Sequence, residues 1–302
     1  MSSRIRLFIE NFFAYGLINA LNRVIPILLL PIVTRLLTDT ADYGRFDMFN
    51  TLVSFGSSLA GLGIYDAMFR EFFEKDDLEY KRTVTSNALY IVLCSSFLVA
   101  GVLILFKESF ALAFLGSRIY TSIIVFAGIG IIIGTLRLVV AAPTRMQNKR
   151  KIYIYSGVLN STLYYALAIV LILRGHAYLS LITSNLISGF LLLLFFFILN
   201  HRYFSLRLSD KKVRSELYKI GIPLMPTFII YWVFHSVDKI MITHMIGLDV
   251  VGIYSVGSRV ASISNFIYAA FAGGFSYFKF STMKDEDQVI MNSRLFDYLG
   301  LI

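Results

Sequence analysis

The sequence predicts an all-α bundle of about eight transmembrane helices. Apolar residues make up 57% of its 302 residues and charged residues only 16%, whereas soluble domains are roughly 45–50% apolar and about 25% charged. The apolar residues gather in runs of about 20 or more, the length that a helix needs to cross a bilayer core of about 30 Å. The runs do not alternate with a period of two, which excludes membrane-spanning strands.

Eight such runs follow one another along the chain. The first comes after a short basic segment, 1–6, that resembles the start of a signal peptide, but the run is too long and no Ala-x-Ala cleavage site follows. We therefore expect it to remain as a span. The predicted spans are Phe12–Leu37, Phe46–Phe69, Thr85–Phe106, Tyr120–Val140, Ile152–Leu173, Ala177–Leu199, Ile220–Ile246 and Val250–Phe278.

Lysine and arginine are distributed unequally between the two sides of these spans. Nineteen lie on the side of the N-terminus, five on the other side and four inside the spans. The positive-inside rule therefore predicts a multi-pass protein with a cytoplasmic N-terminus. The same bias explains the net charge of +9 without nucleic acid as a partner. The basic loops are expected to lie near anionic lipid headgroups.

Two pairs of spans resemble each other. The first and seventh hold four of the five prolines, and the second and eighth open on a Gly–aromatic pattern around Gly44 and Gly252. An even number of spans separates the copies, which is typical of a parallel repeat. We predict a first six-helix lobe over residues 1–200, a basic cytoplasmic linker over 201–219 and an incomplete second lobe over 220–302. A complete eight-span protein is the alternative.

Polar side chains form one stripe, at helical spacing, along each of the first, second, seventh and eighth spans. Such stripes are expected to face a shared aqueous cleft; close packing of small residues is the alternative for Ser and Gly alone. Packing does not explain charges inside a span, which cost at least about 2.5–3.5 kcal/mol each. The intramembrane cations are Arg23, Arg137, Lys239 and Arg259, against Asp238, with Asp47 near the outer end. A cationic cleft suits an anionic ligand, and the guanidinium fork matches phosphate oxygens.

Several stretches resemble a known family. The segment from Asn11 to Thr38, followed by Ala41-Asp42-Tyr43-Gly44, is similar to the N-terminus of the polysaccharide-biosynthesis flippases, O-antigen type members of the multidrug/oligosaccharidyl-lipid/polysaccharide exporter superfamily. The segments 221–226, 236–239 and 251–255 resemble the seventh and eighth helices of that family. The resemblance implies two six-helix lobes around a central cavity. It also implies alternating access that carries an undecaprenyl-diphosphate-linked oligosaccharide to the outer leaflet. The sequence departs from the family in lacking its last spans.

Under this resemblance the candidate substrate-binding residues take separate roles. The four intramembrane cations would attract the diphosphate, and Asp238 would pair with a cavity cation or couple transport to H⁺ or Na⁺. Because Asp238 and Lys239 are adjacent, they point about 100° apart and need different partners. The candidate hydrogen-bonding residues for sugar are Asn19, Asn22, Ser255 and Ser262. Membrane lipids and other polysaccharide assembly proteins are the further partners expected.

Other functions are weighed against this one. A drug/cation antiporter of the same superfamily would need carboxylates in the cavity; an inactive fragment, a membrane enzyme of glycan assembly and a non-transporting scaffold are the remaining alternatives. No phosphate-binding Gly-x-x-x-x-Gly-Lys loop is present, and we expect no enzyme activity and no cofactor. The single cysteine and four separated histidines argue against a metal site.

Overall fold

All regular structure in the described part of the chain is helical. The computed structural model describes residues 28–37, 39–175, 177–205 and 210–261, with the single positions 290, 293 and 297. No strand occurs in these ranges, and residues 28–36 are helical. The later helices are α2 (Thr40–Gly61), α3 (Ile64–Phe72), α4 (Leu78–Leu105), α5 (Lys107–Leu115), η1 (Arg118–Tyr120), α6 (Thr121–Met146), α7 (Arg150–Leu173), α8 (Ala177–Asn200), η2 (His201–Tyr203), α9 (Lys211–Met245) and α10 (Leu248–Ala261).

These helices form the all-α, multi-pass bundle that the sequence predicts. In the described ranges five helices are long and apolar enough to cross a membrane, and α2 with α3 forms a sixth, bent span. They correspond to the second to seventh predicted spans. Most of the first predicted span, including Arg23, lies outside the described residues, and the eighth is described only over α10.

The second predicted span, Phe46–Phe69, is not one continuous helix. It bends by 50° between α2 and α3, where Leu62 and Gly63 have φ values of 48° and 65°. These left-handed conformations end a right-handed helix, and glycine adopts them without steric cost. The break packs closely on α9, since a Cβ on Gly63 would lie 2.3 Å from the carbonyl oxygen of Gly221. The length of an apolar run does not predict such a break, because the run continues through it.

One whole helix and the start of another occupy segments where the sequence predicts connections. The short helix α5 lies between α4 and α6 and buries Ala111, Phe114 and Leu115. The helix α9 begins at Lys211, after Asp210, whose side chain accepts a hydrogen bond from the Lys212 N–H at 2.7 Å. The second half of the basic segment 201–219 is therefore helical, and Asp210 is an ordinary N-cap that marks this start.

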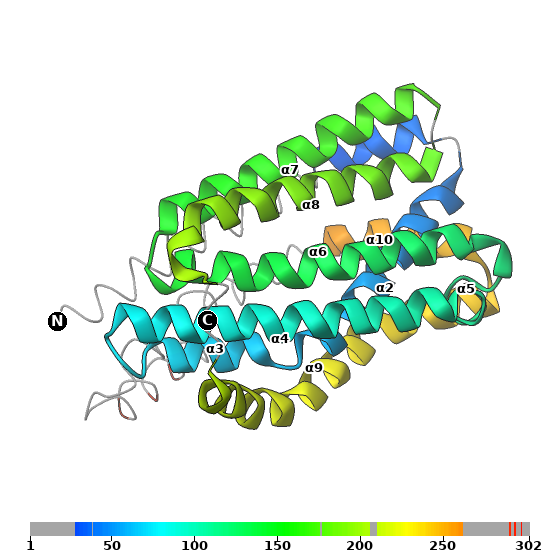
Figure 1. The fold of residues 1–302 in the computed structure, drawn as a ribbon. Helices are drawn as coiled ribbons and strands as arrows, with labels where there is room; N and C mark the ends of the chain where they lie inside the picture. The colour runs from blue at the N-terminus through cyan, green and yellow to red at the C-terminus, as the bar shows by residue number, and fades with distance from the viewer. Residues whose placement is uncertain are drawn as a thin grey trace.

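The helices bury apolar side chains in several clusters and expose others on the outside. Figure 1 shows α7 and α8 running side by side, α6 next to α8, and α9 curving along the other side of the bundle. Pro223 and Pro226 lie inside α9, and proline is a common cause of helix bending. Leu98, Leu105 and Ile198 are 67–76% exposed. In a bilayer such side chains contact lipid, so their exposure fits a membrane bundle.

Two glycines that correspond in the predicted repeat allow α2 and α10 to touch. A Cβ on Gly44 would lie 1.9 Å from the Leu248 carbonyl oxygen, and a Cβ on Gly252 would lie 2.2 Å from the Thr40 carbonyl oxygen. Each glycine thus faces the residue four positions before the other. This reciprocal contact is the geometry of two elements related by a twofold axis, which supports α2 and α10 as corresponding helices.

Gly44→Ala is expected to separate α2 from α10 and to destabilise the fold by about 1–3 kcal/mol, the usual cost of overpacking. Gly101→Ala is the matched control, because a Cβ on Gly101 of α4 meets nothing within 4 Å and alanine favours the helix. Thermal unfolding of the purified variants in detergent measures both. Equal midpoints for the two variants would contradict the close contact between α2 and α10.

Candidate functional site: a polar cluster and a cationic cavity

Asp47 of α2 is the centre of a buried polar cluster that joins three helices. Its side chain is only 6% exposed, and Lys239 Nζ of α9 lies 2.7 Å from Oδ2. Ser255 Oγ of α10 donates a hydrogen bond to the same oxygen at 2.8 Å. Arg259 Nη2, also on α10, lies 3.8 Å from Oδ1. A buried carboxylate is costly unless it is paired and hydrogen-bonded, so this cluster ties α2 to α9 and α10.

The cluster lies between the two helices that the predicted repeat pairs with each other. Asp47 and Ser255 are 208 residues apart, the same spacing that separates Gly44 from Gly252. Residues at corresponding positions therefore contact each other twice along the α2–α10 interface. The glycines bring the two backbones together, and this approach lets the short Ser255 side chain reach the Asp47 carboxylate.

The cluster changes the charge expected for the cleft. Lys239 and Arg259 both lie within ion-pair distance of the Asp47 carboxylate, so one described anion offsets part of the charge of two cations. Sequence reasoning placed Asp47 in the polar stripe of its span but did not identify it as a site residue. The stripe was the available signal, because it puts Asp47, Asn50 and Ser54 on one side of α2.

Aromatic rings surround the guanidinium of Arg259. Its Cζ lies 5.2 Å from the centroid of the Tyr43 ring and 6.0 Å from that of Phe46. The Phe46 ring in turn stacks on Tyr164 of α7, with 6.1 Å between the centroids. Cation–π contacts stabilise a guanidinium without removing its charge. They therefore orient Arg259 while it remains cationic.

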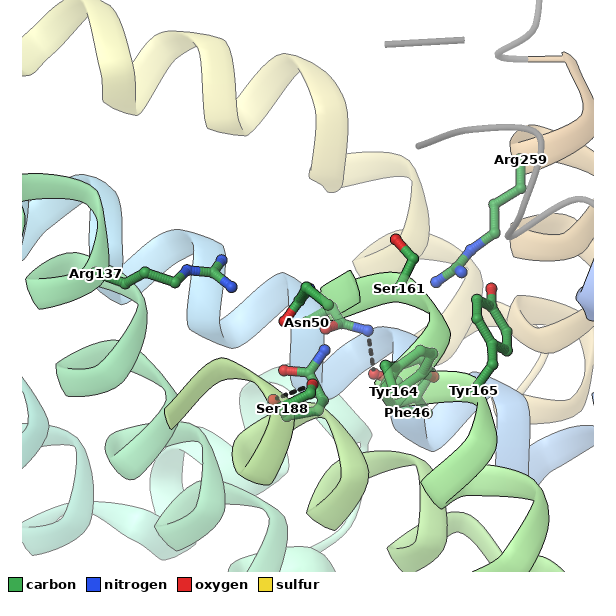
Figure 2. Close-up of a pocket in the computed structure, with 10 residues that line it drawn as sticks. Phe46, Asn50, Arg137, Ser161, Tyr164, Tyr165, Ser188 and Arg259 are labelled. Carbon is green, nitrogen blue, oxygen red and sulfur yellow. Dashed lines mark hydrogen bonds between the residues drawn. The ribbon is translucent and has the colours of Figure 1, made fainter. Parts of the chain in front are cut away.

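Arg259 and Arg137 point into one cavity of about 240 Å³. Figure 2 shows Arg137 of α6 and Arg259 of α10 reaching toward each other from opposite ends, with Asn50 and Ser161 between them. The wall is rich in amides, hydroxyls and aromatic rings. Its other residues are Phe46, Asn160, Tyr164, Tyr165, Asn185 and Ser188. The cavity is therefore polar and cationic, and none of these lining residues is acidic.

Arg137 differs from the other intramembrane cations that the structure describes. Lys239 and Arg259 both lie within ion-pair distance of Asp47, whereas Arg137 forms no ion pair with a described residue. Nearby, the buried Asn160 Oδ1 has no hydrogen-bond partner among the described residues. An unpaired cation inside a span costs at least about 2.5–3.5 kcal/mol. Water or a mobile anion in the cavity would offset this cost.

The remaining predicted site residues are distributed as follows. Lys239 and Ser255 belong to the Asp47 cluster and do not line the cavity. Asp238 accepts hydrogen bonds from the Tyr254 hydroxyl and from the Lys239 backbone N–H, the latter at 2.8 Å. Among the described residues its side chain thus bonds a phenol rather than a cation, and Asp238 and Lys239 have different partners. Arg23, Asn19, Asn22 and Ser262 lie outside the described residues.

No group of three or more His, Cys, Asp or Glu side chains in the described ranges is placed to hold a metal ion. The helices and the charged cavity together define a multi-pass membrane protein with an internal polar site. Comparison with solved structures shows which known membrane proteins have a similar fold.

The fold is similar to that of MATE family transporters. An outward-facing multidrug resistance MATE transporter of the MOP superfamily superposes with a TM-score of 0.67 at 14% identity, over 99% of this chain and 70% of that one. A MATE mutant superposes with a TM-score of 0.71 at 15% identity, over 99% of this chain and 71% of that one. A MOP superfamily transporter from Pyrococcus furiosus superposes with a TM-score of 0.63 at 13% identity, over 92% of this chain and 66% of that one. The chain thus spans 66–71% of the length of these three structures.

The sequence of the chain shows the family to which it belongs. Residues 32–295 match the profile of the family described as polysaccharide biosynthesis protein, and the chain belongs to that family. The match confirms the resemblance that the N-terminal and the seventh- and eighth-helix segments indicate. No curated protein sequence matches the chain.

Proposed function

We propose that the chain acts in a flippase that moves an undecaprenyl-diphosphate-linked oligosaccharide, an O-antigen unit or a similar one, across the inner membrane. The observation that carries this proposal is the cavity with Arg137 and Arg259 at opposite ends and no acidic lining residue among those described. A diphosphate offers several anionic oxygens, and a guanidinium donates two parallel hydrogen bonds to such a group. Binding the diphosphate would compensate Arg137, which lacks an ion pair among the described residues.

The neutral part of the cavity wall suits a sugar. Asn50, Asn160, Asn185, Ser161 and Ser188 supply both donors and acceptors. The Oδ1 atom of Asn160 is buried and has no hydrogen-bond partner within the described ranges. Membership in a polysaccharide biosynthesis family supports this substrate class. These neutral groups would hold the glycan while the two arginines hold its diphosphate anchor.

Alternating access requires a contact that closes one side of the cavity and opens later. The α2–α10 interface, with its glycine contacts and the Asp47–Ser255 hydrogen bond, lies at the end of the spans that the charge bias places outside. In this proposal it closes the outer side while the substrate binds from the cytoplasmic leaflet. Membrane lipids and other polysaccharide assembly proteins would be its partners. The chemistry is transport, and no bond of the substrate is broken.

A drug/cation antiporter is the second candidate, because the fold is shared with multidrug MATE transporters. Such a function favours carboxylates in the cavity. The described cavity instead has two arginines, and Asp47 is held by Lys239, Arg259 and Ser255. Pocket polarity differs within the superfamily: the binding pocket of the Pyrococcus furiosus transporter has a reverse polarity, which suggests a different function for that protein.

Equilibrium binding separates the two candidates. The chain in phosphatidylcholine nanodiscs is titrated with farnesyl diphosphate, with farnesol as the matched apolar control, and with ethidium as a quaternary ammonium dye. We expect the diphosphate to bind at least tenfold more tightly than farnesol, which corresponds to about 1.4 kcal/mol, and ethidium to bind no better than farnesol. Tighter binding of ethidium than of the diphosphate would overturn the flippase proposal in favour of the antiporter.

A further inference from the structure

A second cavity adjoins the first one between α6, α7 and α8. Its volume is about 280 Å³, and it shares Arg137, Asn160 and Ser161 with the first cavity. Arg137 therefore borders both spaces. Its guanidinium forms no ion pair with a described residue, so no described anion neutralises the charge at this boundary.

The walls of the two cavities differ in chemistry. Besides its polar residues, the second cavity is lined by Leu138 and Ala141 of α6 and by Leu192 and Phe196 of α8. No aliphatic side chain is among the described residues that line the first cavity. Ala141 and Phe196 are buried in an apolar cluster, and Leu192 packs against it. Part of the wall of the second cavity is therefore apolar, whereas polar and aromatic groups line the first cavity.

Arg137 and part of the apolar wall lie on the same side of α6. The cavity-lining residues Gly134, Arg137, Leu138 and Ala141 follow one another at a spacing of three and four residues, and residues at this spacing share one side of a helix. Leu138 lines the cavity yet is 47% exposed, so the cavity is open beside this side chain. Among the described helices, α7 packs much more extensively on α8 than on α6. The second cavity therefore extends from Arg137 to an opening at an apolar side chain.

We propose that the second cavity holds the prenyl units next to the diphosphate, while Arg137 binds the diphosphate at the boundary and the first cavity holds the glycan. The inference rests on the proposed function for the identity of the ligand. A prenyl diphosphate-linked oligosaccharide is apolar on one side of its anionic group and polar on the other. The two cavities have the same order: a partly apolar wall, a cation without an ion pair among the described residues, and a wall of amides and hydroxyls.

The apolar wall removes a cost that the position of Arg137 creates. A prenyl chain in the bilayer is already surrounded by apolar groups, so its transfer into the protein has no hydrophobic driving force of its own. The units attached to a diphosphate inside the bundle would, however, meet water or polar groups if the whole wall were polar. Leu138, Leu192 and Phe196 give these units apolar contacts instead. The opening beside Leu138 lets the rest of the chain stay in lipid.

Photolabelling of the wild-type chain locates the prenyl units directly. The chain in phosphatidylcholine nanodiscs is irradiated with a farnesyl diphosphate analogue that carries a benzophenone in its prenyl chain, and the labelled peptides are identified by mass spectrometry. We expect labels in the peptides that contain Leu138 and Leu192. Excess farnesyl diphosphate is expected to suppress this labelling. Farnesol at the same concentration is expected to leave most of it, because farnesol should bind at least about tenfold more weakly.

Gly134→Leu is the variant designed to fill the second cavity. Gly134 lines this cavity, and among the described residues an added Cβ would meet only Ser57 Oγ, at 3.7 Å. By isothermal titration calorimetry, binding of farnesyl diphosphate is expected to weaken at least about tenfold, and binding of inorganic pyrophosphate, which has no prenyl chain, to change less than about twofold. Gly101→Leu is the matched control, because a Cβ on Gly101 meets nothing within 4 Å and this residue lines neither cavity. It should leave both affinities unchanged.

The outcomes separate this inference from the proposed function. Labels that farnesyl diphosphate suppresses but that lie outside the second cavity would overturn the assignment of the prenyl units and leave the flippase proposal standing. Equal affinities of the two leucine variants for farnesyl diphosphate, or an equal loss of pyrophosphate binding in Gly134→Leu, would do the same. If Gly134→Leu does not fold, the labelling of the wild type decides. A wild-type chain that binds farnesyl diphosphate no better than farnesol would overturn both.

Discussion

Arg137→Gln is expected to abolish transport of the lipid-linked oligosaccharide without destabilising the protein. The substitution removes the one described intramembrane cation that forms no ion pair with a described residue, so the cost of burying that charge, at least about 2.5–3.5 kcal/mol, disappears. Charged hydrogen bonds to the substrate, worth about 1.5–3 kcal/mol each, disappear with it. Surface polysaccharide in cells and the thermal midpoint of the purified variant measure the two effects.

Arg174→Gln is the control for this experiment, because Arg174 is exposed beyond the end of α7 and does not line the cavity that contains Arg137. It should leave transport and stability unchanged. Arg137→Lys should retain part of the activity, since it keeps the charge and loses the bidentate fork. If Arg137→Gln lowered the midpoint and transport together, Arg137 would have a structural role, and the assignment of a ligand-binding cation would fail.

Asp47→Asn is expected to destabilise the protein by about 3–5 kcal/mol, the cost of leaving a buried charge without its partner. The substitution removes the carboxylate that Lys239 and Arg259 share. Lys239→Gln should cost less alone, because Asp47 keeps Arg259 and the Ser255 hydrogen bond. Denaturant unfolding of the single and double variants in detergent gives the coupling energy of the pair.

The double variant decides whether the pair acts as a unit. If it does, Asp47→Asn with Lys239→Gln is expected to be more stable than Asp47→Asn alone, because no unpaired lysine remains. Ser255→Ala is the milder control and should cost about 1 kcal/mol for one hydrogen bond. Strict additivity of the two substitutions would contradict the ion pair between α2 and α9.

Much of the fold could be predicted because membrane spans follow from the length of apolar runs. The runs predict α4, α6, α7, α8 and α9. The spacing of Gly44 and Gly252 predicts a repeat, and the structure places these two glycines in contact between α2 and α10. The break at Leu62–Gly63 could not be predicted from composition, since an apolar run continues through it. The Gly-Leu-Gly sequence around Leu62 was the available local signal.

The site could be predicted only in part, because helical periodicity shows which side of a helix is polar but not which helix it faces. The polar periodicity identified Arg137 and Arg259, which line one cavity. It also identified Lys239 and Ser255, which contact Asp47. It did not show that Asp47 joins the last two, since that contact bridges residues about 200 positions apart.

The most direct test of the account is complementation in cells that lack their own O-antigen flippase and receive the matching glycan pathway. Membrane insertion is confirmed by blot, and surface polysaccharide is measured for the wild type, Arg137→Gln and Arg174→Gln. The account predicts surface polysaccharide with the wild type and Arg174→Gln and none with Arg137→Gln. Wild-type chain that is inserted at normal levels and yields no surface polysaccharide would contradict the claim that this chain is a flippase.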